Sequence, residues 1–506
     1  MQPIHFTPTF EEFEILATRG NLIPVRAEIL ADLETPVSAF LKLNKNDGQT
    51  GQPAFLLESV EGGEALARFS FLGVGARATL KTKGREVWIT KNGQSEYSHL
   101  EDGRDPLHVL EEIMAQYSFV ETPGLPRFCG GAVGFLGYDL VRFFEKLPNP
   151  PHDDREIADC HLLLTDTLLI FDSVRHSVVV LNNAFIEGDA RKAYDEACAK
   201  IEATLGKLST PVADATLLPV STNIQEPEPQ SNFAREDYEA AVAKAIEYIH
   251  SGDCVQVVPS QRFEVPLSAA PFDVYRALRH ISPAPYMFFL NLDDVQLIGA
   301  SPEILVTEDA GKVTTRPLAG TRRRGSTPAE DAALETELLA DLKERAEHIM
   351  LVDLHRNDIG RVCEYGSVHV DELMTVARYS HVMHIESNVV GTLRKDKTGF
   401  DLLRATFPAG TLSGAPKVRA MQIIDELEPT QRGPYGGAIG YFSFSGNLDT
   451  CITLRTIVVK NDVAYVQAGG GVVADSVPGD EYEETRNKAR AALRAIALAE
   501  SANAAT

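Results

Sequence analysis

Helix and strand patterns follow one another in separate blocks along this chain instead of alternating. Period-two alternation typical of strands dominates 54–90 and 437–467, while amphipathic helix patterns fill long separate stretches such as 235–250 and 328–352. A doubly wound fold needs a helix between successive parallel strands. The order therefore favours an α+β fold of two intimately packed lobes, with large, mostly antiparallel sheets in a sandwich-like arrangement and helices flanking them.

Length and composition divide the chain. With 506 residues it is roughly twice the size at which single hydrophobic cores stop growing. The segment 209–232 is rich in Pro, Thr, Ser, Gln and Glu and shows little periodicity, which is typical of a linker. We expect an N-terminal lobe over 1–208, a linker over 209–232 and a second lobe over 233–506.

The pattern of apolar residues predicts the individual elements. We expect helices at 9–19, 105–117, 189–208, 235–250, 272–280, 328–352 and 415–427, and strands at 54–60, 68–73, 78–90, 162–171, 177–181, 255–265, 287–306, 368–393 and 437–467. The six residues 130–135 (GGAVGF) resemble 436–441 (GGAIGY). Six small or apolar residues match easily by chance, so we infer no repeat.

Charge and cysteine content exclude several classes of protein. The formal net charge of −24 argues against nucleic acid as a partner, and the basic run 322–324 is too short to reverse it. The six cysteines show no C-x-x-C spacing, which argues against a disulfide framework or a zinc site. The N-terminus lacks the pattern of a signal peptide, and no apolar run approaches the ~18 residues of a membrane span. We expect a cytoplasmic protein with no membrane partner.

A glycine run followed by acids marks the candidate site. Gly469, Gly470 and Gly471 leave backbone N–H groups uncovered and free to take unusual φ, which suits a loop around an anion. Glu481 and Glu484 stand three apart at the start of a predicted helix, so both point from one face. Two carboxylates beside such a loop fit a Mg²⁺ ion that bridges them to an anionic ligand. A glycine turn followed by a solvated acidic helix start explains the same residues, and both interpretations stay open.

Three other segments carry candidate groups. Glu347 lies at the border of the buried face of its predicted helix, where a carboxylate needs a partner or a metal, although a surface pair with Lys343 explains it equally. The loop 407–417 brings small residues into a helix with Ser413 near its cap, which makes an anion pocket. Arg455 is expected within the apolar strand Ile452 to Val459, where an arginine indicates a bound anion or a buried carboxylate.

These residues also belong to ordered landmarks. By them the chain resembles component I of anthranilate synthase, within the chorismate-utilising enzyme family, over nearly its whole length. The landmarks are LLES (56–59), PYM (285–287), SPE (301–303), PLAGT (317–321), EHIMLVDLHRND (347–358), VMH (382–384), GTLSGAPK (410–417), RGPYGGAIGY (432–441) and GDEYEETRNKA (479–489).

The resemblance implies a set of binding residues. It implies that Glu347 and Glu484 ligate Mg²⁺, with Glu481 at or near the metal, and that the metal holds the ring carboxylate of chorismate. The groups implied to bind the two carboxylates and fix the ring are Gly320, Thr321, Tyr435, Arg455 and the backbone of Gly469, Gly470 and Gly471. The reaction implied is attack of ammonia at ring carbon 2 with loss of the 4-hydroxyl, then elimination of pyruvate to give anthranilate.

The resemblance also implies catalytic groups. Glu303 resembles the family's general acid, with a pKa raised by burial, and His384 is implied to assist either departure of the hydroxyl or elimination of pyruvate. Relatives that add water carry a lysine base where this chain has Gln256, and aminodeoxychorismate synthases commonly carry a lysine nucleophile in place of Ala319. Both differences favour direct use of ammonia.

The supply of ammonia and the feedback control of the enzyme each imply a further binding partner. No cysteine here has the glycine-flanked context of a glutamine-hydrolysing nucleophile, so the resemblance implies a separate glutamine amidotransferase subunit, component II, in a hetero-oligomer. It further implies that the lobe 1–208 carries a tryptophan feedback site and that 233–506 is the chorismate-binding catalytic domain of an enzyme at the first step of tryptophan biosynthesis. The tryptophan-binding residues implied are Glu58, Ser59, Pro285, Tyr286 and Met287; without the resemblance these would be ordinary strand residues of the core.

Two alternatives remain open at this point. One is component I of aminodeoxychorismate synthase, against which Ala319 and the LLES stretch argue. The other is a non-catalytic sensor of tryptophan or chorismate, which has no need of an acid, a metal and an anion pocket together.

Overall fold

A large antiparallel sheet forms one layer of the molecule. The computed structural model describes residues 4–44, 52–59, 68–212, 215–219, 226–379 and 382–503. In spatial order this first sheet contains β1 (Leu22–Leu30), β10 (Ser177–Phe185), β9 (Thr167–Asp172), β3 (Phe69–Val74), β2 (Ala54–Glu58), β14 (Tyr286–Leu292), β15 (Val295–Ser301), β24 (Thr456–Lys460), β25 (Val463–Gly469), β13 (Ser260–Pro266) and β11 (Gln230–Ser231).

A second antiparallel sheet faces the first. Its strands in spatial order are β18 (Leu318–Arg323), β20 (Val382–Thr392), β17 (Lys312–Thr315), β16 (Ile304–Asp309), β23 (Leu448–Ile452), β22 (Ala438–Ser443), β7 (Gly131–Leu136), β8 (Cys160–Thr165), β4 (Ala78–Lys83), β5 (Glu86–Lys91) and β6 (Gln94–His99), with β19 (His369–Arg378) also paired to β20. A small third sheet joins β12 (Gln256–Val257) to β21 (Gly414–Ala415).

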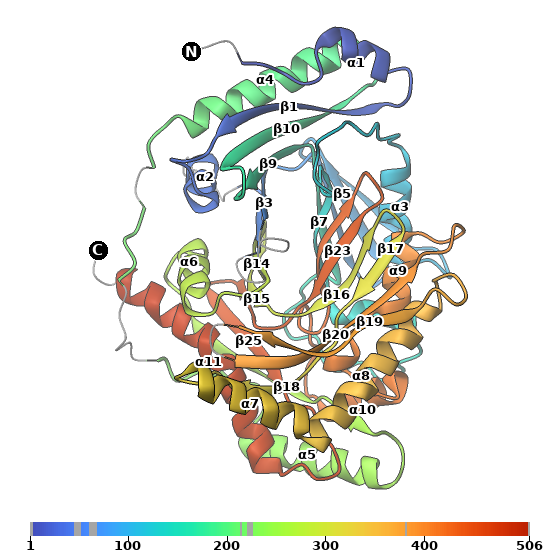
Figure 1. Cartoon of the computed structure of the whole chain (residues 1–506), viewed down its shortest axis with the longest axis vertical. Helices are drawn as coiled ribbons and strands as arrows, with labels where there is room; N and C mark the ends of the chain where they lie inside the picture. The colour runs from blue at the N-terminus through green and yellow to red at the C-terminus, as the bar shows by residue number, and fades with distance from the viewer. Residues whose placement is uncertain are drawn as a thin grey trace.

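Helices cover the outer faces of both sheets. They are α1 (Phe10–Leu16), α2 (Pro36–Leu43), α3 (Pro106–Ala115), α4 (Ala190–Leu208), α5 (Arg235–His250), α6 (Pro271–Ile281), α7 (Pro328–Ala340), α8 (Leu342–Gly360), α9 (Gly399–Thr406), α10 (Lys417–Leu427) and α11 (Pro478–Asn503), with 3₁₀ turns η1 (Tyr138–Phe143) and η2 (Gly410–Leu412). Figure 1 shows α4 lying along β1 and β10, and α6 beside α11 against the lower part of the first sheet. The predicted α+β fold is confirmed.

The hydrophobic core has three layers that follow from this arrangement. Residues of both sheets, such as Phe135 on β7 and Phe288 on β14, interdigitate in the central layer. One outer layer lies between the first sheet and α1, α2, α4, α6 and α11, and the other packs the second sheet against α3, α8, α9 and α10. Burial on both faces explains why strands such as Gly131–Leu136 are apolar throughout instead of alternating.

Each sheet combines strands from both halves of the chain. In the first sheet β2 pairs with β14, and in the second β7 pairs with β22. The predicted division at 209–232 therefore separates the sequence without separating the sheets, and 213–214 and 220–225 lie outside the described residues, as do Val60 of the predicted strand 54–60 and positions 380–381 of 368–393. The division into domains stays a prediction.

The two similar segments that we had not counted as a repeat are neighbours in space. They form most of β7 and β22, which pair antiparallel with Gly134 opposite Gly440. A Cβ at Gly134 would lie 2.1 Å from the carbonyl oxygen of His161, and one at Gly440 would lie 2.0 Å from that of Asp449. The matching glycines thus let adjacent backbones approach on both sides of this strand pair.

Several predicted elements differ in detail from the structure. The predicted helix 328–352 is two helices, because Asp341 ends α7 and caps α8 by accepting hydrogen bonds from the N–H groups of Lys343 and Glu344. The predicted strand 255–265 is divided into β12 and β13, which belong to different sheets. Ser413 is not a helix cap: its hydroxyl donates to the Ala409 carbonyl at 2.9 Å, and α10 begins at Lys417.

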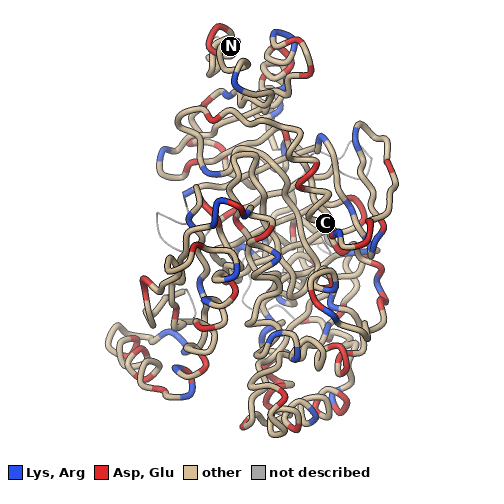
Figure 2. Tube along the Cα trace, turned by 90° about the vertical axis from the view of Figure 1, so that its right-hand side faces the viewer, with Lys and Arg blue, Asp and Glu red and all other residues tan. Residues whose placement is uncertain are grey.

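Ion pairs neutralise the one basic run of the sequence. Arg322 pairs with Glu337, Asp341 and Glu344, Arg323 with Glu330 and Arg324 with Asp331. Figure 2 shows Lys and Arg interleaved with Asp and Glu along the trace. Among the described residues, no helix is both long and apolar enough to cross a bilayer.

Candidate active site

The side chain of Gln256 meets that of Glu347 across two elements. Gln256 on β12 is buried, and its amide nitrogen donates to the Glu347 carboxylate at 2.9 Å. Glu347 lies on α8, as expected at the border of the buried face, and no surface pair with Lys343 forms. Burial raises the pKa of Glu347, the hydrogen bond from Gln256 lowers it, and the charge of Glu344 raises it further.

The glycine run brings the other acidic helix to the same place. A Cβ on Gly470 would lie 2.6 Å from Oε2 of Glu481, and one on Gly471 would lie 2.7 Å from Nε2 of Gln256. None of the three glycines has a positive φ, and the N–H of Gly470 donates to the Pro259 carbonyl at 3.2 Å. The expectation of unusual φ and three open amides is therefore wrong. The residues are small because side chains approach them closely.

Glu481 and Glu484 have different surroundings on the first turns of α11. One oxygen of Glu481 accepts from the Ser476 hydroxyl at 2.7 Å, while the other is buried without a hydrogen-bond partner among the described residues. Burial and then the nearby charge of Glu484 raise the pKa of Glu481, against the Ser476 hydrogen bond. Glu484 is exposed and pairs with Lys488 at 2.7 Å.

Lys488 links the acidic helix to the glycine run. Its ammonium also donates to the Gly469 carbonyl at 2.9 Å, and its charge lowers the pKa values of Glu303, Glu347 and Glu481. Lys488 is therefore near enough to these three carboxylates for its charge to act on them. The sequence alone did not single out Lys488, because a lysine four residues after a glutamate is the usual pattern of a solvated helix pair.

The donor set fits a magnesium ion held partly by its ligand. The described residues contain no cluster of three or more His, Cys, Asp or Glu side chains arranged as a closed metal cage. Mg²⁺ instead usually uses one or two protein carboxylates and takes its remaining oxygens from water and an anionic ligand. The unpartnered buried oxygen of Glu481 and the raised pKa of Glu347 suit that open coordination. Magnesium ligation by Glu347, Glu481 and Glu484 stays a prediction.

Glu303 is a buried carboxyl group with an unusually high pKa. It lies between β15 and β16, only 6% exposed, and its Oε1 has no hydrogen-bond partner in the described part of the chain. Burial raises its pKa to about 8, against the opposing influence of the Thr411 hydroxyl and the Arg455 guanidinium. At neutral pH this carboxyl holds a proton and can donate it, as a general acid requires.

His384 is oriented by the strand beside it. It lies on β20 opposite Thr321 of β18, and its Nδ1 is 2.9 Å from the Gly320 carbonyl and 3.1 Å from the Thr321 hydroxyl. Donation to that carbonyl places the proton on Nδ1 and leaves Nε2 as the acceptor. Burial lowers the pKa of His384, and the Gly320 carbonyl opposes this shift. Gly320 has φ of +67°, which favours glycine.

Arg455 lies at a break between strands. β23 ends at Ile452 and β24 begins at Thr456, so the predicted continuous strand around Arg455 is wrong. Its φ of +48° is uncommon for an arginine and is typical of a functional position. Burial lowers its pKa, while the nearby Glu303 and Tyr379 raise it. The guanidinium thus lies close to the candidate acid, as an anion-binding group at this site would.

A buried ion pair holds the walls of the site together. Arg432 donates to both oxygens of Glu428 at 2.9 and 2.6 Å and to the carbonyls of Leu412 and Val258 at 2.7 and 2.6 Å. Leu412 belongs to the loop before α10, and Val258 follows β12. The pair therefore joins the segment of Gln256 to the loop that carries Thr411.

Comparison with known proteins agrees with this geometry. A profile of chorismate binding enzymes matches residues 52–494. Anthranilate synthase component 1 of Acetivibrio thermocellus is 49% identical over 97% of this chain and 98% of its own length, and that of Pseudomonas putida is 49% identical over 98% and 99%. The crystal structure of anthranilate synthase component I from Streptococcus pneumoniae TIGR4 covers 92% of this chain and 99% of its own at 38% identity, with a TM-score of 0.76. The chain belongs to the family of anthranilate synthase component I, among the chorismate binding enzymes.

A large cavity in this member of the family gathers the residues expected to bind tryptophan. It has a volume of about 630 Å³, in the usual range for a small ligand, and its lining includes Leu57, Glu58, Ser59, Pro285, Tyr286 and Met287. Strands β2 and β14 bring the two groups together, with Met287 opposite Glu58. The hydroxyl of Tyr286 donates to Asp449 at 2.9 Å, and Arg127 pairs with the same carboxylate at 2.7 Å.

The carboxylate of Glu58 is already engaged elsewhere. It accepts from the Tyr275 hydroxyl at 2.5 Å and from Arg279 at 3.0 and 3.2 Å, and both partners belong to α6 on the outer face of the sheet. The side chain of Glu58 therefore anchors α6, although Glu58 is also among the residues that line the cavity. Its partners lie more than 200 positions away in sequence, so no local pattern indicates them.

Proposed function

We propose that this chain is the large subunit of anthranilate synthase, which converts chorismate and ammonia to anthranilate and pyruvate. The observation that carries the proposal is Glu303, a buried carboxyl group with a pKa of about 8 beside Arg455. Loss of the 4-hydroxyl of chorismate as water needs a proton donor, and a carboxyl group with this pKa supplies one at neutral pH. Arg455 supplies the charge that holds a carboxylate of the substrate near that donor.

The acidic groups support a role for Mg²⁺. Chorismate is a dianion, which Glu347, Glu481 and Glu484 would otherwise repel. A bound Mg²⁺ supplies the positive charge that holds a ring carboxylate among these acids. We propose that Arg455 and Tyr435 bind the substrate carboxylates and fix the ring, and that Lys488 contributes a second cation from α11.

The neutral side chain of Gln256 supports attack by ammonia. A primary amide, Gln256, lies against Glu347, and an amide cannot take a proton from water. Ammonia carries its own lone pair and needs no such base. His384 presents Nε2 as an acceptor, which suits it to remove the ring proton when pyruvate leaves.

We further propose how the subunit is supplied and controlled. Ammonia comes from a glutamine amidotransferase partner, component II, with which this chain forms a hetero-oligomer in the cytoplasm. Tryptophan binds in the cavity lined by Ser59, Pro285 and Met287 and inhibits the enzyme. The same cavity is lined by Tyr379, whose ring centroid lies 5.7 Å from that of His384, so the inhibitor contacts the neighbour of a catalytic group.

Product analysis tests the proposal directly. Purified chain with chorismate, Mg²⁺ and an ammonium salt at high pH is expected to form fluorescent anthranilate and pyruvate, and glutamine alone is expected to give neither until component II is added. Formation of isochorismate or aminodeoxychorismate without anthranilate contradicts the proposal, as does chorismate binding in calorimetry without turnover.

A further inference from the structure

A second, much smaller cavity lies behind Tyr435. Its volume is about 10 Å³, and its lining includes Arg155, Arg262, Thr453 and Gln467. This is roughly the space that one water molecule occupies. All four side chains are at least nine-tenths buried, so bulk solvent does not reach their polar atoms. Each of these atoms needs a hydrogen-bond partner within the folded protein or a bound molecule.

Four polar atoms around this cavity lack partners. They are Nε of Arg155, Nε of Arg262, Oγ1 of Thr453 and Oε1 of Gln467, each buried and without a hydrogen bond to any described residue. A buried polar group without a hydrogen bond destabilises the folded state, because it has lost its bonds to water and gained none in return. Four of them lining one small cavity indicate a bound molecule.

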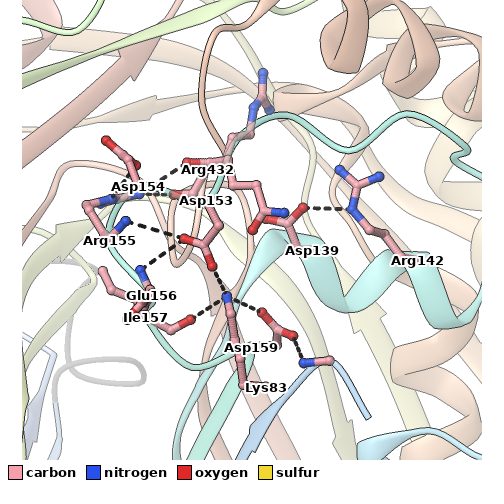
Figure 3. A network of polar contacts seen from close by, with 12 residues as sticks. Lys83, Asp139, Arg142, Asp153, Asp154, Arg155, Glu156, Ile157, Asp159 and Arg432 are labelled. Carbon is pink, nitrogen blue, oxygen red and sulfur yellow. Dashed lines mark hydrogen bonds and ion pairs between the residues drawn. The ribbon is translucent and has the colours of Figure 1, made fainter. Parts of the chain in front are cut away.

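The neighbouring contacts fix which atoms remain. Arg262 uses its Nη atoms on Asp154, and Arg155 uses Nη2 on the carbonyls of Gln431 and Arg432 at 3.3 and 3.0 Å (Figure 3 shows contacts of Arg155). The Nε of Arg155 lies 3.8 Å from Oδ1 of Asp154, too far for a hydrogen bond, so the Nε–H groups of both arginines remain without an acceptor among the residues that the structure describes.

The amide of Gln467 cannot be turned round. Its Nε2 donates to the Ser260 hydroxyl at 2.9 Å, and that hydroxyl gives its own hydrogen to Glu428 at 2.8 Å. The Ser260 oxygen can therefore only accept from Gln467. The atom of Gln467 left over is an acceptor, Oε1.

These groups select the ligand by charge and by hydrogen-bond count. Two guanidinium groups exclude a cation, and an anion would face the unpartnered oxygen of Gln467. The ligand accepts from two N–H groups and donates to Oε1 of Gln467, and once its lone pairs are used it can bond the Thr453 hydroxyl only by donating to it. Ammonia has one lone pair and accepts only once, whereas water has two lone pairs and two hydrogens.

We propose that one buried water molecule occupies this cavity, accepts from Arg155 and Arg262 and donates to Thr453 and Gln467. It joins the loop of Arg155 in the N-terminal half to β13 and β25 of the first sheet and to the break between β23 and β24 that holds Thr453. Thr453 precedes Arg455 by two residues, and Gln467 precedes Gly469 by two. The water thereby positions the two backbone segments that carry the proposed substrate-binding groups, an effect on binding that rests on the proposed function.

A crystal structure of the full chain tests the site without any substrate. The expected result is one density peak within hydrogen-bond distance of all four atoms, unchanged after a soak in sodium bromide. No peak, or an anomalous signal from bromide at this position, overturns the proposal, the second result in favour of an anion.

A double-mutant cycle in urea gives an independent measurement. If Thr453 and Gln467 share one water, the drop in unfolding midpoint for Thr453→Val with Gln467→Met is smaller than the sum of the two single drops. The matched control is Thr450→Val, a buried threonine whose hydroxyl already donates to Val306 at 2.9 Å, and its drop adds to that of Gln467→Met. Additive drops for Thr453→Val and Gln467→Met overturn the shared water.

Kinetics of the same variants test the positioning effect. Thr453→Val is expected to raise KM for chorismate severalfold with kcat little changed; equal loss in kcat overturns the positioning role. The crystallographic and unfolding results do not depend on chorismate, so they stand even if the reaction proves to be a different one.

Discussion

The amide nitrogen of Gln256 lies 2.9 Å from a carboxylate oxygen of Glu347 and donates a hydrogen bond to it. This contact joins two segments that are 91 positions apart and keeps a neutral group beside a proposed metal ligand. A cation at the same place would compete with Mg²⁺ for that carboxylate.

Substitution Gln256→Lys is therefore expected to weaken Mg²⁺ binding. Changes next to a metal ligand typically cost about 10- to 100-fold in affinity, and we expect a loss in this range from Mg²⁺ titration by calorimetry and from the Mg²⁺ dependence of turnover. Gln296→Lys is the control, because Gln296 bonds Asn291 on β14 and lies outside the site. Equal Mg²⁺ affinity in Gln256→Lys and the parent chain would show that Glu347 is not a ligand.

Substitution Glu303→Gln is expected to abolish the proton donor while keeping the shape of the side chain. General acid catalysis typically contributes about 10²- to 10⁴-fold, so kcat is expected to fall in that range with a smaller change in KM. In the parent chain kcat is expected to decline as pH rises past about 8, where Glu303 loses its proton. A variant with nearly full kcat would exclude Glu303 as the acid.

The same carboxyl group makes stability depend on pH. Its pKa of about 8 in the folded protein lies above the ordinary value of 4.5 for a glutamate, so the folded state holds the proton more tightly than the unfolded chain. Its contribution is fully present below pH 4.5 and is lost as pH rises to about 8. Glu303→Gln does not titrate, so its stability relative to the parent chain is expected to increase from the lower to the upper end of this window. The change in the difference of unfolding free energy, measured from urea midpoints, is expected to be on the order of a few kcal/mol. A constant difference would contradict the raised pKa.

Breaking the buried pair of Arg432 and Glu428 is expected to be strongly destabilising. Removal of one partner of a buried pair typically costs about 3–5 kcal/mol, because the other charge stays buried alone. Arg432→Met is expected to show this loss in urea unfolding, and Arg432→Met with Glu428→Gln is expected to recover part of it. Losses that simply add would show that the two charges do not act as a pair.

The cavity lined by Ser59, Pro285 and Met287 is expected to hold the inhibitor. Ser59→Phe adds a ring at its lining and is expected to abolish inhibition by tryptophan while turnover stays within about twofold, because Ser59 lies outside the catalytic groups. Ser98→Phe on the exposed strand β6 controls for the bulk of the new side chain. Unchanged inhibition in Ser59→Phe would place tryptophan elsewhere.

Local patterns predicted most helices well. The periodic run with Tyr238 and Val242 predicted α5 at the bounds that it has, and Asp189 caps α4 where the sequence indicated. The break at Asp341 was missed although its cap is local, because good helix formers on both sides continue the helical pattern through it. The strand break at Arg455 was missed because its neighbours are all good strand residues.

The candidate site was predicted in kind but not in its contacts. Residue types and landmarks indicated which carboxylates matter, because burying a carboxylate is unfavourable unless a partner or a metal ion compensates its charge. The raised pKa of Glu303 depends on burial by distant segments, and the engagement of Glu58 by Tyr275 depends on how α6 docks on the sheet. Neither is a property of local sequence. The glycine run shows the same limit, because its role is to admit side chains from β12 and α11.

Because β2 pairs with β14 and β7 pairs with β22, each half of the chain needs the other to complete both sheets. Either half expressed alone would expose an unpaired strand edge in each of the two sheets, and such edges promote aggregation with other chains. Deletion of the N-terminal half would therefore also unpair strands of the sheets that carry the candidate catalytic residues.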